Sequence, residues 1–559
     1  MKKKFISLDT TILLGSLLLI LSSGFSLLIP LALKGLIDQK GDAFNTGSLL
    51  QVVVLFIGQA LFVSLGNYLF ALSGERQVAS LRQKVSQHLI YAPKTFFDAR
   101  KSGELSSRIV NDTATIREFV VTSLPFFLAS IITLIGTTAV LFYLDWKLSL
   151  VLLLALPLMA IFIIPLSSIG QKYAKILQDE TSQLTGELTE QFQEIELIKT
   201  QGAEEQTSQL LSKQIETMRK ISIKSDLVAA FNSPFALLFI FGTVALIFTY
   251  GGQRVAAGSL TVGTLVSFLI YLFQLLNPVG GLSDFFTAKA KVAGATAELA
   301  QLLEIKPEQL YEGSQPRNGD LIFENVSFSY QPEKTILEGI DLVFPQQKKI
   351  ALVGPSGSGK STIFHLIERF YPVSSGRILF GEADISEFSL ASWRQKLALV
   401  SQNAAVFSGS IRDNLCYGLN REVSDTELYT ALDKAALLKD IEQMPHGLET
   451  AVGERGKLLS GGQKQRLQIA RAYLRQADFI LFDEATANLD ADAEYAVTQS
   501  LNAVAEDKTV IIIAHRLSTV VDADIIYVID QHRVTGVGNH AELLETHETY
   551  ARFVSEQML

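Results

Sequence analysis

The first half of the chain is dominated by long apolar runs separated by polar stretches. Six of these runs have about 20 residues, the length that crosses a bilayer as an α-helix. They are Ile12–Leu33, Leu49–Leu72, Phe119–Leu144, Leu148–Ile169, Phe231–Tyr250 and Leu260–Val279. Few charges lie inside them, which fits a cost of about 2.5–3.5 kcal/mol for one charge at a helix centre. Six such runs in succession favour membrane spans over the buried helices of a soluble protein.

The distribution of Lys and Arg predicts how the spans are oriented. Basic residues gather before the first run, between the second and third runs, and between the fourth and fifth runs. The other three loops hold about one basic residue each, namely Lys40, Lys147 and Arg254. Because cytoplasmic loops carry the excess of positive charge, the N-terminus, both long loops and everything after the sixth run are expected in the cytoplasm. The first run is too long for a signal peptide and no A-x-A cleavage site follows it, so it is interpreted as an uncleaved span. The expected location is therefore the plasma membrane, with multiple spans and both termini cytoplasmic.

The two long cytoplasmic loops keep a helical periodicity, as in Leu184, Leu188, Phe192, Ile195 and Ile198. A helix rises 1.5 Å per residue, so extensions of about 20–25 residues would project some 30–40 Å beyond the bilayer. We expect these extensions to contact something in the cytoplasm.

The character of the chain changes after the sixth run. A stretch rich in Pro, Gly and Ser follows Lys306, and such clusters mark a boundary. Short apolar strands then alternate with helical patterns, for example at Lys349–Val353, Phe479–Phe482 and Val510–Ala514. This alternation predicts an α/β domain with a parallel sheet. The predicted organisation is a transmembrane domain at 1–305, a linker at 306–320 and an α/β domain at 321–559.

Composition agrees with a membrane protein. Of 559 residues, 48% are hydrophobic and 19% are charged, below the roughly 25% of a typical soluble domain. The net charge of −9 excludes an overall basic, nucleic-acid-binding balance. A single cysteine, Cys416, cannot form an intrachain disulfide and is expected as a small buried apolar group.

A phosphate-binding motif lies in the second half. The segment Gly354-Pro355-Ser356-Gly357-Ser358-Gly359-Lys360-Ser361 fits G-x-x-x-x-G-K-[ST], follows an apolar strand and opens a helix that continues with Thr362. Its glycines let backbone N–H groups converge on phosphate oxygens at a helix N-terminus. Lys360 is expected to reach the β- and γ-phosphates, and the Ser361 hydroxyl to ligate Mg²⁺.

Two carboxylates follow a later apolar strand. Phe479–Phe482 runs directly into Asp483 and Glu484. Asp483 is expected to bind Mg²⁺, directly or through water, and Glu484 to accept a proton from the attacking water as the catalytic base. A solvated strand end is the alternative for this pair taken alone.

The segment Leu459-Ser460-Gly461-Gly462-Gln463 resembles the signature of ATP-binding-cassette (ABC) ATPases. By this resemblance, Ser460, Gly461, Gly462 and Gln463 would face the ATP held by a second copy of the domain. Other family motifs occur in the expected order. They are Tyr330, expected to stack on adenine; Gln402, expected to sense Mg²⁺ and the attacking water; Asp490 of the D-loop; and His515, the switch histidine on the γ-phosphate. Taken singly, Tyr330 and His515 are as well explained as structural residues, so their joint order around the phosphate motif carries the resemblance.

The resemblance extends over nearly the whole chain. Six spans before one cassette are similar to half-size ABC exporters of the multidrug type, with a type IV all-α transmembrane domain and an α/β P-loop NTPase cassette. Gly103–Arg108 with Asp112 is similar to the first coupling-helix region of those proteins, and Glu194–Glu204 to the second. The D-loop departs from the common pattern, since it reads Ala487-Asn488 before Leu489-Asp490.

The resemblance implies a transporter driven by ATP and Mg²⁺. Two chains would dimerise head to tail into two composite ATP sites and export or flip hydrophobic or amphipathic compounds by alternating access. The intact Glu484 and signature favour a homodimer over a heterodimer. Many phenylalanines in the spans suit a hydrophobic small molecule, although packing or lipid contact also explains them. A lipid or peptide substrate stays an alternative, and two other classes, an anchored ATPase acting on DNA or ribosomes and an ATP-gated channel, fit the spans and the charge less well.

Overall fold

The computed structural model describes the chain except residues 1–4, 40–45, 101, 484–490, 515 and 559. It also leaves undescribed the side chains of 102, 155–160, 162–163, 232–233, 236, 277, 279–280, 283, 491–494, 518 and 557–558. The chain divides into two units. One combines Met1–Gln87 with Gly103–Glu304, and the other combines His88–Ser102 with Ile305–Leu559.

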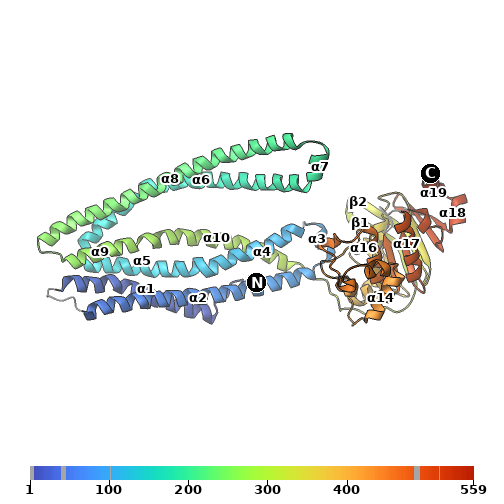
Figure 1. Cartoon of the computed structure of the whole chain (residues 1–559), viewed down its shortest axis with the longest axis horizontal. Helices are drawn as coiled ribbons and strands as arrows, with labels where there is room; N and C mark the ends of the chain where they lie inside the picture. The colour runs from blue at the N-terminus through green and yellow to red at the C-terminus, as the bar shows by residue number, and fades with distance from the viewer. Residues whose placement is uncertain (1–4, 40–45, 101, 484–490, 515, 559) are drawn as a thin grey trace. The chain divides into compact units, whose positions relative to one another are not determined.

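The first unit is helical (Figure 1). Its helices are α1 (Thr10–Asp38), α2 (Thr46–Ile90), α4 (Ser102–Glu118), α5 (Leu124–Leu144), α6 (Trp146–Gln193), α7 (Ile195–Thr200), α8 (Glu204–Ala256), α9 (Val262–Gln274) and α10 (Leu276–Glu304), and a π-helical turn at Phe119–Ser123 joins α4 to α5. Within the described residues, four helical stretches are long and apolar enough to cross a membrane: Thr10–Asp38, Thr46–Ile90, Gly103–Leu144 and Leu237–Ala256. They overlap four of the six predicted spans.

The other two predicted spans differ from single isolated helices. Leu148–Ile169 lies inside α6, where several side chains are outside the described residues. The predicted span Leu260–Val279 is divided between α9 and α10, with a one-residue interruption of the helix at Leu275. Pro278 explains the break. It has no N–H to donate to the carbonyl of Gln274, four residues earlier, so the helix cannot continue unbroken through this position.

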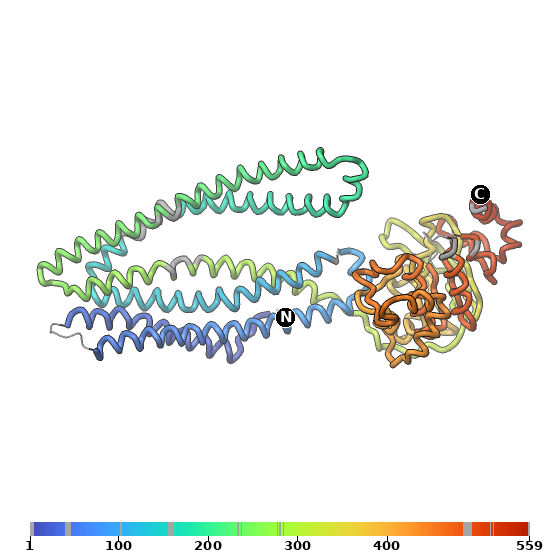
Figure 2. Tube along the Cα trace, in the orientation of Figure 1, coloured from blue at the N-terminus to red at the C-terminus, as the bar shows by residue number. Residues whose placement is uncertain are grey.

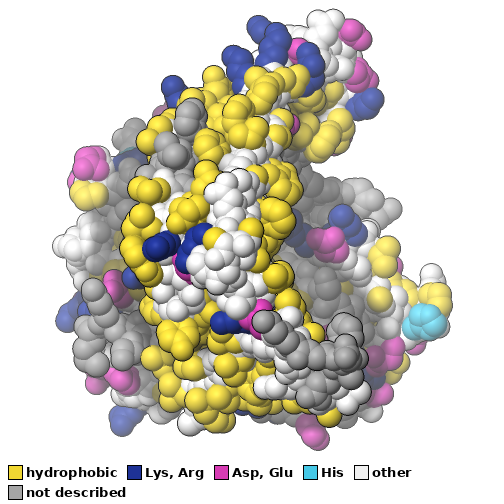
Figure 3. Space-filling model, turned by 90° about the vertical axis from the view of Figure 1, so that its left-hand side faces the viewer, with side chains coloured by type: hydrophobic (Ala, Val, Ile, Leu, Met, Phe, Trp, Pro, Cys, Tyr) yellow, Lys and Arg dark blue, Asp and Glu magenta, His cyan; other side chains and the backbone are white. Residues whose placement is uncertain are grey.

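The helices pack along their lengths. α6 and α8 form a long pair joined through α7 (Figure 2), and α1 packs against α9 and α5. Apolar side chains also cover the outside of the unit, as at Leu14, Leu61 and Phe248, each more than half exposed. At the end where α8 meets α9, hydrophobic and uncharged side chains prevail (Figure 3). An apolar exterior of this extent is stable in lipid and not in water.

The second unit contains two sheets. A six-stranded sheet has the order β10-β9-β3-β8-β7-β6, in which only β10 runs antiparallel to its neighbour, and a four-stranded antiparallel sheet has the order β2-β1-β4-β5. The strands are β1 (Leu321–Gln331), β2 (Lys334–Phe344), β3 (Lys349–Val353), β4 (Ser375–Phe380), β5 (Ala383–Asp384), β6 (Leu397–Val400), β7 (Phe479–Asp483), β8 (Thr509–Ile513), β9 (Ile525–Asp530) and β10 (Arg533–Gly538). The predicted parallel α/β sheet is confirmed.

The larger sheet is buried on both faces. In β3, Ile350 and Leu352 join the core shared with the small sheet, whereas Ala351 and Val353 join the core under the helices. This two-sided burial explains why the strand is continuously apolar. The helices of this unit are α11 (Lys360–Ile367), α12 (Leu390–Gln395), α13 (Ile411–Cys416), α14 (Asp425–Lys434), α15 (Leu438–Glu442), α16 (Gly461–Arg475), α17 (Ala491–Val504), α18 (His540–Thr546) and α19 (Glu548–Met558). Cys416 is the last residue of α13 and is partly buried against the core that contains Ala351 and Val353.

A short helix from the N-terminal half belongs to the second unit. α3 (Lys94–Asp98) begins after Pro93, and the carbonyl of Tyr91 accepts a hydrogen bond from the N–H of Glu308 at 2.7 Å. Gly103–Arg108 and Asp112, which resemble the first coupling-helix region, lie within α4 of the first unit. The second such region, Glu194–Glu204, contains α7.

Candidate functional site

The phosphate motif forms a tight loop between β3 and α11. Gly359 has φ +99° and caps α11, a left-handed conformation that favours glycine. Gly354 lies so close to β9 that an added Cβ would be 2.0 Å from the carbonyl oxygen of Ile529. The two glycines therefore meet backbone requirements that larger residues could not, and the loop ends at the first turn of a helix.

Lys360 and its neighbours are arranged around this loop. The Lys360 ammonium is buried and donates hydrogen bonds to the carbonyls of Gly354 (2.8 Å) and Pro355 (2.9 Å). Ser361 is exposed in the first turn of α11, and Thr362 is buried behind it. The loop thus concentrates one positive charge and a helix N-terminus at one point, an arrangement suited to phosphate.

The strands β3, β6 and β7 bring other predicted residues to the same edge of the sheet. Gln402 follows the end of β6, Asp483 ends β7, and both strands run parallel within the sheet that contains β3. Ligands of such sheets bind beyond the carboxyl ends of the strands. The hydroxyl of Ser361 and the carboxylate of Asp483 are oxygen donors of the kind that Mg²⁺ prefers, so the donor set fits this ion. Glu484, Asp490 and His515 lie outside the described residues.

Tyr330 lies at the end of β1 beside the phosphate motif. Its hydroxyl is 3.2 Å from that of Thr362 and 2.9 Å from Nδ1 of His365, both on α11. Its ring stands edge-on to that of Tyr371, with centroids 4.9 Å apart. The side chain keeps 44% of its surface exposed. A partly exposed aromatic ring fixed by its hydroxyl is able to stack on a planar base.

The residues of the predicted signature form the start of α16. The Ser460 hydroxyl accepts from the N–H of Gln463 at 3.2 Å, and the Gln463 side chain accepts from the N–H of Ser460 at 3.0 Å. This reciprocal capping box fixes the first turn. Ser460 and Gly461 are exposed, whereas Gly462 is buried. α16 packs against α13, α14 and α17, so the signature is a second exposed helix start, separate from the phosphate motif.

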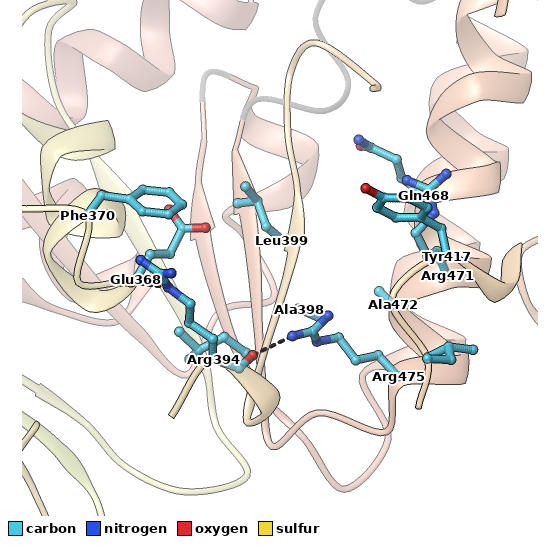
Figure 4. A pocket seen from close by; sticks show the side chains of 12 residues that line it. Glu368, Phe370, Arg394, Ala398, Leu399, Tyr417, Gln468, Arg471, Ala472 and Arg475 are labelled. Atoms are coloured by element: carbon cyan, nitrogen blue, oxygen red, sulfur yellow. Dashed lines mark hydrogen bonds between the residues drawn. The ribbon is translucent and has the colours of Figure 1, made fainter. Parts of the chain in front are cut away.

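A cavity of about 250 Å³ lies between the end of α11 and α16 (Figure 4). Glu368 lines it on one side, and Arg471 and Arg475 line it on the other. Burial raises the pKa of Glu368 to about 7, although the positive charges of Arg394 and Lys94 oppose the shift. The Arg475 guanidinium donates to the carbonyl of Arg394 at 2.6 Å across the cavity.

Comparisons with known proteins cover almost the whole chain. Residues 12–279 match the family "ABC transporter transmembrane region", and residues 337–487 match the family "ABC transporter". A multidrug resistance ABC transporter ATP-binding and permease protein of Lactococcus lactis is 36% identical over 98% of this chain and 93% of its own length. The chain belongs to the ABC transporters. It is a half-size exporter, with a helical transmembrane domain fused to an ATP-binding cassette, and the predicted family and fold class are confirmed.

Two further relatives describe the range of this family. An ATP-dependent lipid A-core flippase of Haemophilus influenzae is 33% identical over 94% of the exporter and 91% of its own length. The structure of a bacterial Atm1-family ABC exporter with ATP bound superposes with a TM-score of 0.80 at 28% identity, covering 98% of both chains. The exporter is accordingly a membrane protein and an ATPase that drives transport.

Sequence reasoning missed two features of the cassette. It did not place α3 against the nucleotide-binding unit, where the Tyr371 hydroxyl donates to Asp98 at 2.5 Å. Pro93 was the available signal, because a proline interrupts a helix. It also missed the buried Glu368, for which the sequence carries no signal beyond one carboxylate after an apolar helix.

Proposed function

We propose that two identical copies of this exporter form a homodimer in which each ATP lies between the phosphate motif of one copy and the signature of the other. The observation that carries this proposal is the exposed, capped start of α16 at Ser460 and Gly461. Free N–H groups at a helix N-terminus favour an anion, and half-size ABC exporters work as dimers. A second copy of the chain supplies the missing surface for each site.

The roles within each site follow from the residue types. The phosphates would be held by the residues of the phosphate motif, namely Gly354, Pro355, Ser356, Gly357, Ser358, Gly359, Lys360, Ser361 and Thr362. Tyr330 would stack on the adenine. Gln402 would lie near the γ-phosphate, and Asp490 would lie at the dimer interface. Ser361, Gln402 and Asp483 would hold Mg²⁺, which neutralises phosphate charge when bound. Glu484 would accept the proton of the attacking water and His515 would contact the γ-phosphate. Ser460, Gly461, Gly462 and Gln463 would complete the site of the other copy.

The proposed substrate is a hydrophobic or amphipathic small molecule. A cavity of about 210 Å³ among α5, α6, α8, α9 and α10 is lined mainly by Leu, Ile and Phe, with the hydroxyls of Thr138, Ser149 and Thr243. Such a lining suits an apolar compound better than a sugar or an ion. The relatives named for multidrug resistance and for lipid A-core flipping fit this class. A lipid or peptide substrate and a heterodimeric partner are the alternatives.

The proposed location is the plasma membrane with both termini in the cytoplasm. Support comes from the excess of Lys and Arg in the two long loops over the short ones. ATP binding would stabilise the closed cassette pair and the outward-facing spans, because only a ligand with different affinities for two states shifts their equilibrium.

The test is ATP hydrolysis by the purified single chain in lipid nanodiscs beside Glu484→Gln, with Glu506→Gln as the matched control. The expected result is activity in the native chain and the control, a loss of a hundredfold or more in Glu484→Gln, and stimulation by amphipathic compounds. An inactive native chain that recovers with a second, different chain would establish a heterodimer. Equal activity in all three proteins would overturn the role of Glu484.

A further inference from the structure

One continuous group of side chains joins Tyr330 to α3 within the second unit. The ring of Tyr371 lies edge-on to that of Tyr330, at an interplanar angle of 87°. The hydroxyl of Tyr371 donates to Asp98 on α3 at 2.5 Å. His365 lies between the two, with Nδ1 2.9 Å from the Tyr330 hydroxyl and its ring centroid 6.0 Å from that of Tyr371. No residue of α3 belongs to the predicted nucleotide site, yet only the side chains of Tyr371 and Tyr330 lie between Asp98 and Thr362 of that site.

The α3 end of this group is held by charge. Lys94 donates to both carboxylate oxygens of Asp98, at 2.8 and 2.9 Å, and its ammonium lies 5.7 Å from the centre of the Phe370 ring. Burial acts against the charge on Asp98, but hydrogen bonds from Lys94 and Tyr371 keep its pKa below the usual range. Hydrogen bonds to an ionised acceptor are about twice as strong as neutral ones. Asp98 therefore fixes the orientation of Tyr371 as long as α3 stays in place.

We propose that Tyr371 is a positioning residue through which α3 controls adenine binding: Asp98 orients Tyr371, and Tyr371 with His365 holds the ring of Tyr330 ready to stack on the base. This inference rests on the proposed role of Tyr330. A ring that is already oriented loses less conformational freedom when the base binds, so the affinity rises. Because coupling between two binding events is reciprocal, a bound adenine also favours the docked position of α3. The signal reaches α3 from the base, independently of the γ-phosphate.

The experiment compares two ligands of the full chain in nanodiscs. ADP engages both the phosphate motif and Tyr330, whereas inorganic tripolyphosphate engages the phosphate motif alone. Calorimetric titration of each ligand, with Mg²⁺, into the native chain, Tyr371→Phe and Asp98→Asn separates the two contributions. Tyr371→Phe keeps the ring and removes only the hydroxyl. Tyr311→Phe is the matched control, because Tyr311 is 81% exposed.

We expect Tyr371→Phe to raise the Kd for ADP about three- to tenfold, the effect of one lost hydrogen bond, and to leave the Kd for tripolyphosphate unchanged. Asp98→Asn changes the Kd for ADP in the same direction, and the double variant is no weaker than Tyr371→Phe alone because both act through one contact. An unchanged Kd for ADP, or equal losses for both ligands, would overturn the proposal.

A further variant separates this inference from the proposed function. Tyr330→Ala removes the stacking ring itself. If it leaves ADP binding unchanged, the role of Tyr330 fails and the control by α3 fails with it. If Tyr330→Ala weakens ADP while Tyr371→Phe and Asp98→Asn do not, only the link to α3 is overturned.

Discussion

The hydroxyl of Tyr271 on α9 donates a hydrogen bond to the backbone carbonyl of Leu27 on α1. Pro30 lies inside α1 and has no N–H, so it leaves the carbonyl of Ser26, four residues earlier, without a helical donor. The Gln274 side chain donates to that carbonyl at 3.3 Å, and the Ser267 hydroxyl donates to the carbonyl of Pro30 at 2.6 Å. Three positions along α9 thus satisfy backbone groups around one proline, which joins the two helices at this point.

Removal of the Tyr271 hydroxyl should weaken the contact between α1 and α9. We expect Tyr271→Phe to destabilise the transmembrane unit by about 1 kcal/mol, the usual size of a side-chain hydrogen bond in a membrane. Thermal unfolding in nanodiscs checks the value, with Tyr143→Phe as control because Tyr143 is 87% exposed. In a Pro30→Ala background, which restores the helical donor to Ser26, Gln274→Leu should cost less than in the native chain. An equal cost in both backgrounds would contradict the role given to Pro30.

Asp145 and Arg254 form an ion pair that joins the start of α6 to the end of α8. Their side chains are only 9% and 17% exposed, with 2.5 Å between Asp145 Oδ2 and Arg254 Nη1. Removing one partner of a buried pair leaves a charge unpaired, and we expect Arg254→Met to cost on the order of 3 kcal/mol. Asp145→Asn should cost a similar amount while keeping the cap on the N–H of Leu148.

The double variant Asp145→Asn with Arg254→Met decides whether the charges or the packing matter. Because it removes both charges, it should recover part of the stability that either single variant loses. Chemical unfolding in nanodiscs measures all three, with Lys147→Gln as an exposed control. A double variant as unstable as the sum of the two single changes would contradict a coupled pair.

Local patterns allowed much of the cassette to be predicted from the sequence. Continuous apolar runs located β3, β7 and β8, and the spacing of Gly359 and Lys360 located the phosphate motif. These features depend on residues that are neighbours in the chain. The break at Leu275 also has a local cause, Pro278, but the apolar composition of the segment outweighed that signal in the prediction of a single span.

Contacts between distant residues could not be predicted in the same way. Asp98 and Tyr371 are 273 residues apart, and no spacing rule relates them. The raised pKa of Glu368 depends on burial at the end of α11, which a carboxylate in a sequence does not reveal. The carbonyls of α1 that accept from α9 are backbone groups, so no residue type marks them.

Ser460 should serve both stability and hydrolysis. We expect Ser460→Ala to lose the cap on α16, a cost of about 1 kcal/mol, and also to lower ATP hydrolysis at least tenfold through the site of the second copy. Asn539→Ala is the matched control, because Asn539 caps α18 with the same reciprocal box. The control should lose similar stability and keep its ATPase activity. Equal loss of activity in both variants would indicate a purely structural role for Ser460.

Glu368 should make the stability of the cassette depend on pH. The side chain is 7% exposed, and burial raises its pKa from an ordinary value of 4.5 to about 7. Between these values the folded state binds more protons than the unfolded state, so the contribution of this group to stability is fully present below pH 4.5 and is lost as the pH rises towards 7. Glu368→Gln stays neutral and lacks this loss. The free energy of unfolding of the variant, relative to that of the native chain, should therefore increase as the pH rises, by up to about 3 kcal/mol above pH 7.

The measurement is the unfolding temperature of the cassette in nanodiscs at several pH values between 4.5 and 8. The difference between Glu368→Gln and the native chain should grow with pH, then level off once the native carboxyl is ionised. Glu333→Gln, at an exposed position, controls for a general effect of removing one negative charge. Added salt also distinguishes the effect of a surface charge from that of the buried carboxylate. A surface charge is screened within about 10 Å at 0.1 M, whereas the cost of burying a carboxylate is not. A difference that stays constant across this range would show that Glu368 is ionised throughout, held by Arg394 and Lys94 against the effect of its burial.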